Sequence, residues 1–277
     1  MTTTVAPRPP FGLEITAEQF ERVRTLLEAT AGIQLSWNKQ ALVRARLARR
    51  LRLRSLSSIS EYLRAVEEDT TGKELADLVD ALTTNKTSFF REPDHFAFLE
   101  KQLPVMAKRK SPVRIWSAGC ATGEEPYSLA LLAQKLFGTE AERRVRILAT
   151  DVSARALQIA KAGHYRTQSL RDVPAEYVHA FPSVDEGRCA VQDSTRRLVQ
   201  FARLNLMAEW PIARTFDVIL CRNVMIYFAR DTRERLLQRF KEWLTPGGYL
   251  LVGHAESLSG MSHTLRYVQP ATYQVCL

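Results

Sequence analysis

The spacing of apolar residues divides the chain into two parts. From Ile15 to about Leu82, apolar residues recur every three or four positions, as they do on the buried face of an amphipathic helix. Four helices are predicted there: one after Thr16, one from about 36–38 with its stripe at 43, 47 and 51, one from about 60, and one over 75–82. We expect residues 12–82 to form an all-helical domain.

The first helix has recognisable signals at both ends. Thr16 and Gln19 stand three residues apart before the apolar stripe, which is typical of a capping box. Gly32 follows the stripe and, because it has no Cβ, favours the left-handed conformation that ends many helices. The Thr- and Pro-rich residues 1–11 are expected to form a flexible tail.

Beyond Thr83, short apolar runs alternate with helical segments. This order predicts an α/β domain over 83–277, with a mostly parallel, Rossmann-like sheet that is covered on both faces. The last two runs are close enough in sequence to pair antiparallel at the sheet edge. The runs are 113–119, 144–151, 215–223, 247–253 and 267–277.

The alternation lapses between Gly163 and Asn205. Two short runs, 188–191 and 197–201, are spaced like the strands of a β-hairpin. We therefore expect a small β-subdomain inserted into the larger domain at about 164–202.

The composition is that of a soluble globular protein. Of 277 residues, 45% are hydrophobic and 25% are charged, which supplies a core and excludes a disordered chain. No apolar run is long enough to predict a membrane span, and the N-terminus lacks the apolar segment of a signal peptide. The four cysteines are scattered without metal-binding or disulfide-framework spacing, so we expect a cytoplasmic protein without a metal site.

The excess positive charge is concentrated in one predicted helix. Lys and Arg number 39 against 30 Asp and Glu, and seven of these basic residues lie between Asn38 and Ser55 with no acid among them. Four of them are predicted to form a charged surface opposite the apolar stripe: Arg46, Arg49, Arg50 and Arg52. Such a surface is typical of a nucleic-acid contact, a docking site for an acidic protein, or an ordinary solvated helix face.

A glycine-containing turn follows the first predicted strand. Gly119 and Gly123 stand where the backbone of a Rossmann-like fold approaches its cofactor closely. Glu124 and Glu125 at the next helix start would repel a pyrophosphate, but they suit the sulfonium, ammonium and hydroxyl groups of S-adenosylmethionine. The alternative is that these two acids only complement the helix dipole.

Asp151 ends the second predicted strand, 28 residues after Gly123. An acid at this place is positioned to bind the ribose hydroxyls of an adenosine cofactor. A cap for the helix that begins near Ser153 is the alternative.

Five linked segments closely resemble the CheR family of chemotaxis receptor methyltransferases, and the resemblance extends over residues 12–277. The segments are 82–93 (LTTNKTSFFREP), 121–128 (ATGEEPYS), 204–206 (LNL), 216–228 (FDVILCRNVMIYF) and 253–256 (GHAE). The resemblance implies methyl transfer from S-adenosylmethionine, with S-adenosylhomocysteine as product, to glutamates on the cytoplasmic methylation helices of chemoreceptors. It also implies that the helical domain recognises the receptor and that the arginine-rich helix docks it.

The resemblance further implies a set of site residues. Arg91 and Tyr227 are expected nearest the transferred methyl group, as catalytic residues, and Asp151 on the ribose. The expected cofactor contacts are Asn85, Thr87, Arg91, Gly119, Glu125, Asp151, Asn205, Leu206, Arg222 and Asn223, and the expected receptor contacts are Arg46, Arg49, Arg50 and Arg52.

Other residues of these segments are expected to be structural. His95 and His254 are interpreted in this way, and Cys120 and Cys221 as small buried residues. In some members of the family the β-subdomain binds a peptide at the receptor's C-terminus. Here its hairpin segment, 182–197, is short and lacks a Gly-rich loop, so we expect an enzyme that does not depend on that peptide.

Two other functions fit parts of the sequence. A nucleic-acid methyltransferase would place the arginine-rich helix on phosphates, but the chain has no Asn/Asp-Pro-Pro-aromatic segment to hold a flipped base. A scaffold that binds S-adenosylmethionine without turnover would share the same fold. We favour the protein methyltransferase, with no nucleic-acid partner and no membrane insertion.

Overall fold

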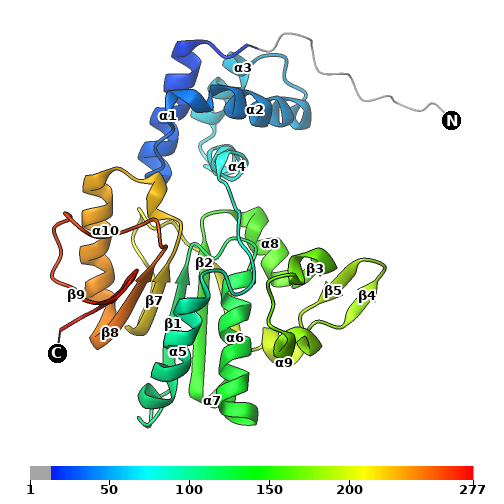
Figure 1. The fold of residues 1–277 in the computed structure, drawn as a ribbon. Helices are drawn as coiled ribbons and strands as arrows, with labels where there is room; N and C mark the ends of the chain where they lie inside the picture. Colours follow the sequence, from blue (N-terminus) through cyan, green and yellow to red (C-terminus); the bar gives the residue numbers. More distant parts are fainter. Residues whose placement is uncertain (1–13, 277) are drawn as a thin grey trace. The chain divides into compact units, whose positions relative to one another are not determined.

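The computed structural model describes residues 14–276, and the chain divides into two compact units between Thr84 and Asn85 (Figure 1). The tail expected at 1–11 lies outside the described residues. Among residues 14–276, no helix has both the length and the apolar character needed to cross a membrane.

The first unit is helical, as predicted. Its elements are α1 (Ala17–Ala31), a short 3-10 turn (Trp37–Lys39), α2 (Gln40–Arg54), α3 (Ile59–Glu68) and α4 (Lys73–Leu82). The capping box is confirmed, because the Thr16 side chain accepts from the backbone N–H of Gln19, whose own side chain accepts from the backbone N–H of Thr16. Gly32 ends α1 in the left-handed conformation.

The core of the helical unit is formed by the predicted apolar stripes. Val43, Leu47 and Leu51 of α2 are buried, and they lie on the same face because they are spaced four apart. Phe20 of α1 and Tyr62 of α3 are also fully buried. Burial of such side chains is worth roughly 1.5–3 kcal/mol each, which is the main contribution that keeps these short helices folded.

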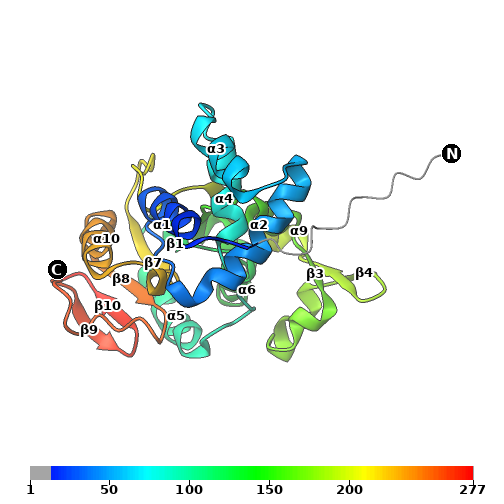
Figure 2. The same ribbon diagram turned by 90° about the horizontal axis from the view of Figure 1, so that it is seen from above.

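The second unit is built on a seven-stranded sheet with the order β6-β2-β1-β7-β8-β10-β9 (Figures 1 and 2). All pairings from β6 to β8 are parallel, whereas β10 pairs antiparallel with both β8 and β9. The predicted parallel sheet with an antiparallel edge is therefore confirmed. The strands are β1 (Val113–Ala118), β2 (Val145–Asp151), β6 (Val199–Arg203), β7 (Phe216–Cys221), β8 (Leu244–Val252), β9 (Arg266–Gln269) and β10 (Thr272–Gln274).

Both faces of this sheet are covered by helices and buried side chains. Successive residues of a strand point to opposite faces. Ile115 accordingly belongs to the core formed with α5 and α6. Trp116 points to the other face, where it packs against Phe240 of α10 and against Trp210 in the loop after β6. The helices of this unit are α5 (Pro93–Met106), α6 (Glu124–Phe137), α7 (Ala141–Arg144), α8 (Ala154–Ala162), α9 (Asp193–Arg196) and α10 (Arg230–Trp243).

The expected β-subdomain is present, but its predicted hairpin is wrong. Strand β5 (Arg188–Ala190) is the middle strand of a separate antiparallel sheet, between β3 (His164–Arg166) and β4 (Ser183–Asp185). The run 197–201 does not pair with it; residues 199–203 form β6, which lies parallel to β2 in the large sheet. A short apolar run does not reveal its partner, and β6 packs its Val199 and Phe201 beside the buried residues of β2 and α8.

Candidate functional site

The turn after β1 is held against the end of β2 by backbone hydrogen bonds. The N–H groups of Gly119 and Cys120 donate to the carbonyl of Thr150 at 2.8 and 2.9 Å. Gly119, Ala121 and Gly123 all have left-handed backbones, with φ of 84°, 49° and 99°. This turn places the start of α6 at the carboxyl end of the parallel strands, where open α/β sheets bind their ligands.

The two glycines of the turn also permit close packing within the protein. A Cβ on Gly119 would collide with the side chain of Val224, in the loop after β7. A Cβ on Gly123 would lie 2.8 Å from the Cβ of Ala160 in α8 and 2.9 Å from the hydroxyl of Tyr165. Any larger residue at either position would therefore push the turn away from its neighbours, a role that the sequence interpretation did not include.

Asp151 connects the turn to the loop after β2. One carboxylate oxygen accepts from the Ala121 N–H and the other from the Ser153 N–H, both at 2.8 Å. Helix α8 is capped by the side chain of Ser153, which accepts from the Ala156 N–H, so Asp151 is not its N-cap. The buried carboxylate is thus fixed at the carboxyl edge of the sheet, between the ends of β1 and β2.

A buried arginine lies between two carboxylates at the same edge. Arg222, directly after β7, has a side chain that is 1% exposed, and its guanidinium lies 2.9 Å from a Glu125 oxygen and 3.0 Å from a Glu92 oxygen. The second oxygen of Glu125 accepts from the hydroxyl of Ser117 at 2.7 Å. Glu125 therefore does more than complement the α6 dipole, because it neutralises Arg222.

Glu256 organises the loop that follows β7. Its carboxylate accepts from the N–H groups of Asn223 at 2.6 Å, Ile226 at 3.0 Å and Gly253 at 2.6 Å. Asn223 has a left-handed backbone, with φ of 60°, and the following 3-10 turn (Met225–Tyr227) presents Tyr227. Burial raises the pKa of Glu256 even though several N–H groups oppose that shift.

The expected site residues come from several segments of the second unit, and the structure brings part of them together. Gly119, Glu125, Asp151, Arg222 and Asn223 lie at the carboxyl ends of β1, β2 and β7.

The remaining expected residues lie on loops. Asn85 donates to the hydroxyl of Ser153 at 3.3 Å, beside Asp151, and Arg91 donates to the carbonyl of Lys86 at 3.0 Å. Asn205 accepts from the Met207 N–H, and Leu206 is buried, after β6. Thr87 and Tyr227 are half-buried.

Two residues of the site were missed by the sequence reasoning. Glu92 and Glu256 both lie in segments that resemble the family, but an acid in a loop gives no sign of its partners. Glu92 contacts Arg222 and His254, and Glu256 contacts Asn223, across more than 30 residues of sequence in each case. These contacts are visible only in the folded structure.

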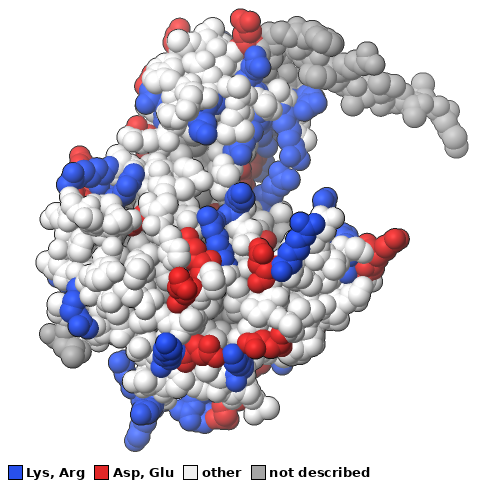
Figure 3. Space-filling view, in the orientation of Figure 1, with Lys and Arg blue, Asp and Glu red and all other residues white. Residues whose placement is uncertain are grey.

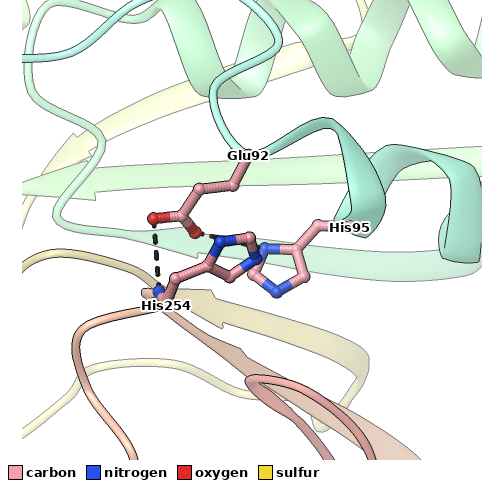
Figure 4. Close-up of side chains that lie close together, drawn as sticks. All are labelled: Glu92, His95 and His254. Atoms are coloured by element: carbon pink, nitrogen blue, oxygen red, sulfur yellow. Dashed lines mark hydrogen bonds and ion pairs between the residues drawn. The ribbon is translucent and has the colours of Figure 1, made fainter.

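Glu92, His95 and His254 form a compact cluster in which one nitrogen or oxygen of each lies within 4.8 Å of the others (Figure 4). Both Glu92 oxygens already accept hydrogen bonds, and the adjacent Arg222 would repel a cation. Burial, reinforced by Arg222, lowers the pKa of His95 to about 4. We therefore interpret His95 as a neutral packing residue beside an ion pair and not as a metal ligand.

The cysteines expected to be structural are buried. Cys120 and Cys221 are 1% and 0% exposed, and burial raises the pKa of both thiols well above the usual value. A thiol in that state is a poor nucleophile.

The arginine-rich helix α2 differs from its prediction. Arg46 donates to the carbonyls of Leu82 and Thr83 at 2.7 and 2.8 Å, and Arg50 forms ion pairs with Glu74 and Asp77 of α4. These two arginines therefore bind their own unit instead of facing solvent. The reason is that α4 supplies the acids Glu74 and Asp77 beside Arg50, and its C-terminal end supplies two backbone carbonyls beside Arg46. The apolar spacing of the separate helices does not reveal these neighbours.

The exposed charge of α2 comes from other residues. Arg44, Arg49 and Arg52 are exposed, and no ion pair is found for them among residues 14–276. Basic side chains stand out on the helical unit in Figure 3. Leu42 and Leu53 are also exposed, at 39% and 66%.

Comparison with known proteins covers both units. The family of the CheR methyltransferase all-alpha domain matches residues 18–83, and that of the CheR methyltransferase SAM-binding domain matches residues 85–274. The chain is 39% identical to chemotaxis protein methyltransferase 2 of Pseudomonas aeruginosa, over 98% of both chains. It is 36% identical to the chemotaxis protein methyltransferase of Borreliella burgdorferi, over 95% of both.

A third relative is also similar over most of its length. The chain is 36% identical to the chemotaxis protein methyltransferase of Escherichia coli, over 92% of this chain and 90% of that protein. The order of a helical unit and then a Rossmann-like unit agrees with these matches. The chain belongs to the CheR family of S-adenosylmethionine-dependent methyltransferases.

Proposed function

We propose that this chain transfers the methyl group of S-adenosylmethionine to glutamate side chains on the cytoplasmic helices of chemoreceptors, giving glutamyl methyl esters. The observation that supports this most is the extent of the match, because the same chemotaxis methyltransferases align with both the helical and the SAM-binding unit. The reaction takes place in the cytoplasm, where these receptor helices lie, and serves sensory adaptation.

The groups at the carboxyl edge of the sheet fit the cofactor. Asp151 accepts from the backbone N–H groups of Ala121 and Ser153 and lies at the end of β2, where an acid of a Rossmann-like fold binds the ribose hydroxyls of an adenosine cofactor. The proposed cofactor contacts remain Asn85, Thr87, Arg91, Gly119, Glu125, Asp151, Asn205, Leu206, Arg222 and Asn223. When bound there, S-adenosylmethionine supplies a methyl group that its sulfonium has already activated.

The rest of the chemistry is positioning. A glutamate with a pKa of about 4.3 is a carboxylate at pH 7, so no general base is required. Holding its oxygen in line with the methyl group is worth roughly 7–11 kcal/mol. Arg91 has N–H groups left after its bond to Lys86 and is proposed to hold the incoming carboxylate, while the Tyr227 hydroxyl orients it.

Helix α2 is proposed to dock the receptor through a smaller set of arginines than the sequence indicated. Arg49 and Arg52 are exposed and suit acidic, glutamate-bearing helices, whereas Arg46 and Arg50 act indirectly by holding α2 in its unit. A protein partner is favoured over nucleic acid because the relatives that match the whole chain are chemotaxis enzymes.

The test is methyl transfer from tritiated S-adenosylmethionine to purified cytoplasmic fragments of a chemoreceptor. We expect label on the receptor that survives nuclease and is released by mild alkali, as a carboxyl ester would be. The variant Asp151→Ala should bind S-adenosylmethionine at least about ten-fold more weakly in calorimetry and lose transfer, because it lacks the proposed ribose ligand. The matched control is Asp172→Ala, which removes an exposed acid of the same unit.

Three results would contradict the proposal. Label found on nucleic acid would indicate a nucleic-acid methyltransferase, and alkali-stable label would exclude an ester. Normal cofactor binding without transfer to any receptor fragment would indicate a binding scaffold.

A further inference from the structure

Glu92 occupies the N-cap position of α5 but does not cap that helix. An acid at an N-cap ordinarily accepts from an N–H of its own first turn, and no such side-chain bond is formed here. The residue also has a left-handed backbone, with φ of 58°, which is unfavourable for any residue with a Cβ. Such a local cost persists when the surrounding structure requires the residue there.

The Glu92 side chain extends instead to the ends of two other strands. One oxygen accepts from Nε and Nη2 of Arg222, at 3.2 and 3.0 Å, just after β7. The other accepts from Nδ2 of Asn223 at 3.3 Å and from the N–H of His254 at 3.2 Å, after β8. One carboxylate thus joins the segment before α5 to both loops.

Glu92 supplies one of the negative charges that balance the buried guanidinium of Arg222. Arg222 is buried and is neutralised by only two carboxylates in the described part of the chain, Glu92 and Glu125. Arg222 also donates to the carbonyl of Arg91, so the guanidinium holds the backbone beside the proposed catalytic arginine. His95 lies 3.5 Å from Glu92, but burial keeps it neutral near pH 7, so it adds no second positive charge for Glu92 to balance.

We propose that Glu92 is a positioning residue for the cofactor site: it fixes Arg222 and, through this guanidinium, the backbone of Arg91. It touches neither substrate nor cofactor in this role and acts through the residues that do. The inference rests on the cofactor contacts of the proposed function. Its test uses cofactor binding alone, so a failure of receptor methylation would leave it standing.

The first experiment compares two variants that each remove one negative charge from the start of α5. Glu92→Gln places an amide N–H₂ against Arg222, whereas Asp94→Asn changes an exposed acid in the first turn of the same helix. Titration calorimetry with S-adenosylhomocysteine is performed well below the unfolding temperature of each variant. We expect Glu92→Gln to bind about ten-fold or more weakly, the size of one lost charge-assisted hydrogen bond, and Asp94→Asn to bind like the wild type.

The second experiment separates positioning from a general loss of stability. The variants Arg222→Met and Glu92→Gln/Arg222→Met complete a double-mutant cycle for cofactor affinity. If Glu92 acts through Arg222, the Glu92 substitution should weaken binding by less than about two-fold in the Arg222→Met background.

Two outcomes would overturn the proposal. One is wild-type affinity in Glu92→Gln, which would show that the carboxylate does not matter for the site. The other is that the losses of the two single variants multiply, which would show that Glu92 acts independently of Arg222.

Discussion

Single carboxylates define this site, and each is fixed by groups from other segments. Asp151 holds two loops by their N–H groups, Glu92 and Glu125 bracket Arg222, and Glu256 gathers the loop after β7. A buried carboxylate is stable only when its oxygens are satisfied in this way. Substitution of any of them should therefore affect the loops as well as the charge.

His95 gives a prediction about acid stability. In the unfolded chain this residue takes up a proton near pH 6.5, but burial keeps it neutral in the folded protein down to about pH 4. Its folded pKa is thus depressed, and protonation favours the unfolded chain as the pH falls through this window. Between pH 7 and pH 5, the wild type should lose about 2 kcal/mol more unfolding free energy than His95→Leu.

Urea unfolding followed by tryptophan fluorescence at both pH values measures this difference. The charged and titratable groups around His95 are Glu92, Arg222 and His254, and all three are unchanged in the variant. The exposed His179 provides the control, because His179→Ala should keep the wild-type pH dependence. If the unfolding free energy of His95→Leu changed with pH as much as that of the wild type, His95 would not be a buried neutral histidine.

At the scale of elements, helix α2 has three faces with different environments. Its stripe of Val43, Leu47 and Leu51 forms the core, Arg46 and Arg50 bind α4 and the end of the unit, and Arg49 and Arg52 face solvent. The periodicity of 3.6 residues places each set on its own face. Substitutions at neighbouring arginines should therefore have different effects.

Arg50→Ala should act on stability. Within residues 14–276 it leaves the buried Glu74 with only the half-exposed Arg54 as an ion-pair partner, at a cost of about 3 kcal/mol. Arg49→Ala/Arg52→Ala should leave stability unchanged and raise the KM for a receptor fragment about five-fold, with the same affinity for S-adenosylmethionine.

Thermal unfolding and receptor methylation kinetics distinguish the two cases. Arg64→Ala, an exposed arginine of α3, is the control for a general loss of positive charge. An unchanged receptor KM in the Arg49/Arg52 variant would show that α2 does not dock the receptor through this face.

At the scale of the whole molecule, the proposed receptor contacts and the proposed cofactor contacts belong to different units. The helical unit ends at Thr84, and the second unit contains every proposed cofactor contact and a small β-subdomain. The strands of this subdomain have three residues each, and β4 at its edge is exposed throughout. We propose that receptor methylation does not require a peptide at the receptor's C-terminus.

This proposal predicts the behaviour of truncated receptors. A receptor fragment that lacks its C-terminal tail should be methylated at an initial rate within about two-fold of the intact fragment, because the proposed docking uses α2 and not the tail. Initial rates at equal receptor concentration measure the effect. A rate that falls ten-fold or more on truncation, and recovers in a tailed fragment, would assign a tether to the β-subdomain.

Much of the architecture was accessible from the sequence for local reasons. Apolar spacing identified the four N-terminal helices, the cap residues marked the ends of α1, and the alternation of strands and helices predicted the parallel sheet. The glycine turn and Asp151 were recognisable because their positions follow directly from the strand order. These features depend on neighbours in sequence, so the chain determines them by itself.

Tertiary structure alone decided which groups meet. It placed β6 in the large sheet, turned Arg46 and Arg50 toward α4, and brought Glu92 to Arg222 across 130 residues. The energies of strand pairing and of buried ion pairs depend on partners that are distant in sequence, and residue type or spacing does not specify those partners. The sequence by itself thus determined the fold class and the place of the glycine turn and Asp151 at the carboxyl edge of the sheet. The packing of distant segments decided which arginines are exposed and which are held by carboxylates or carbonyls.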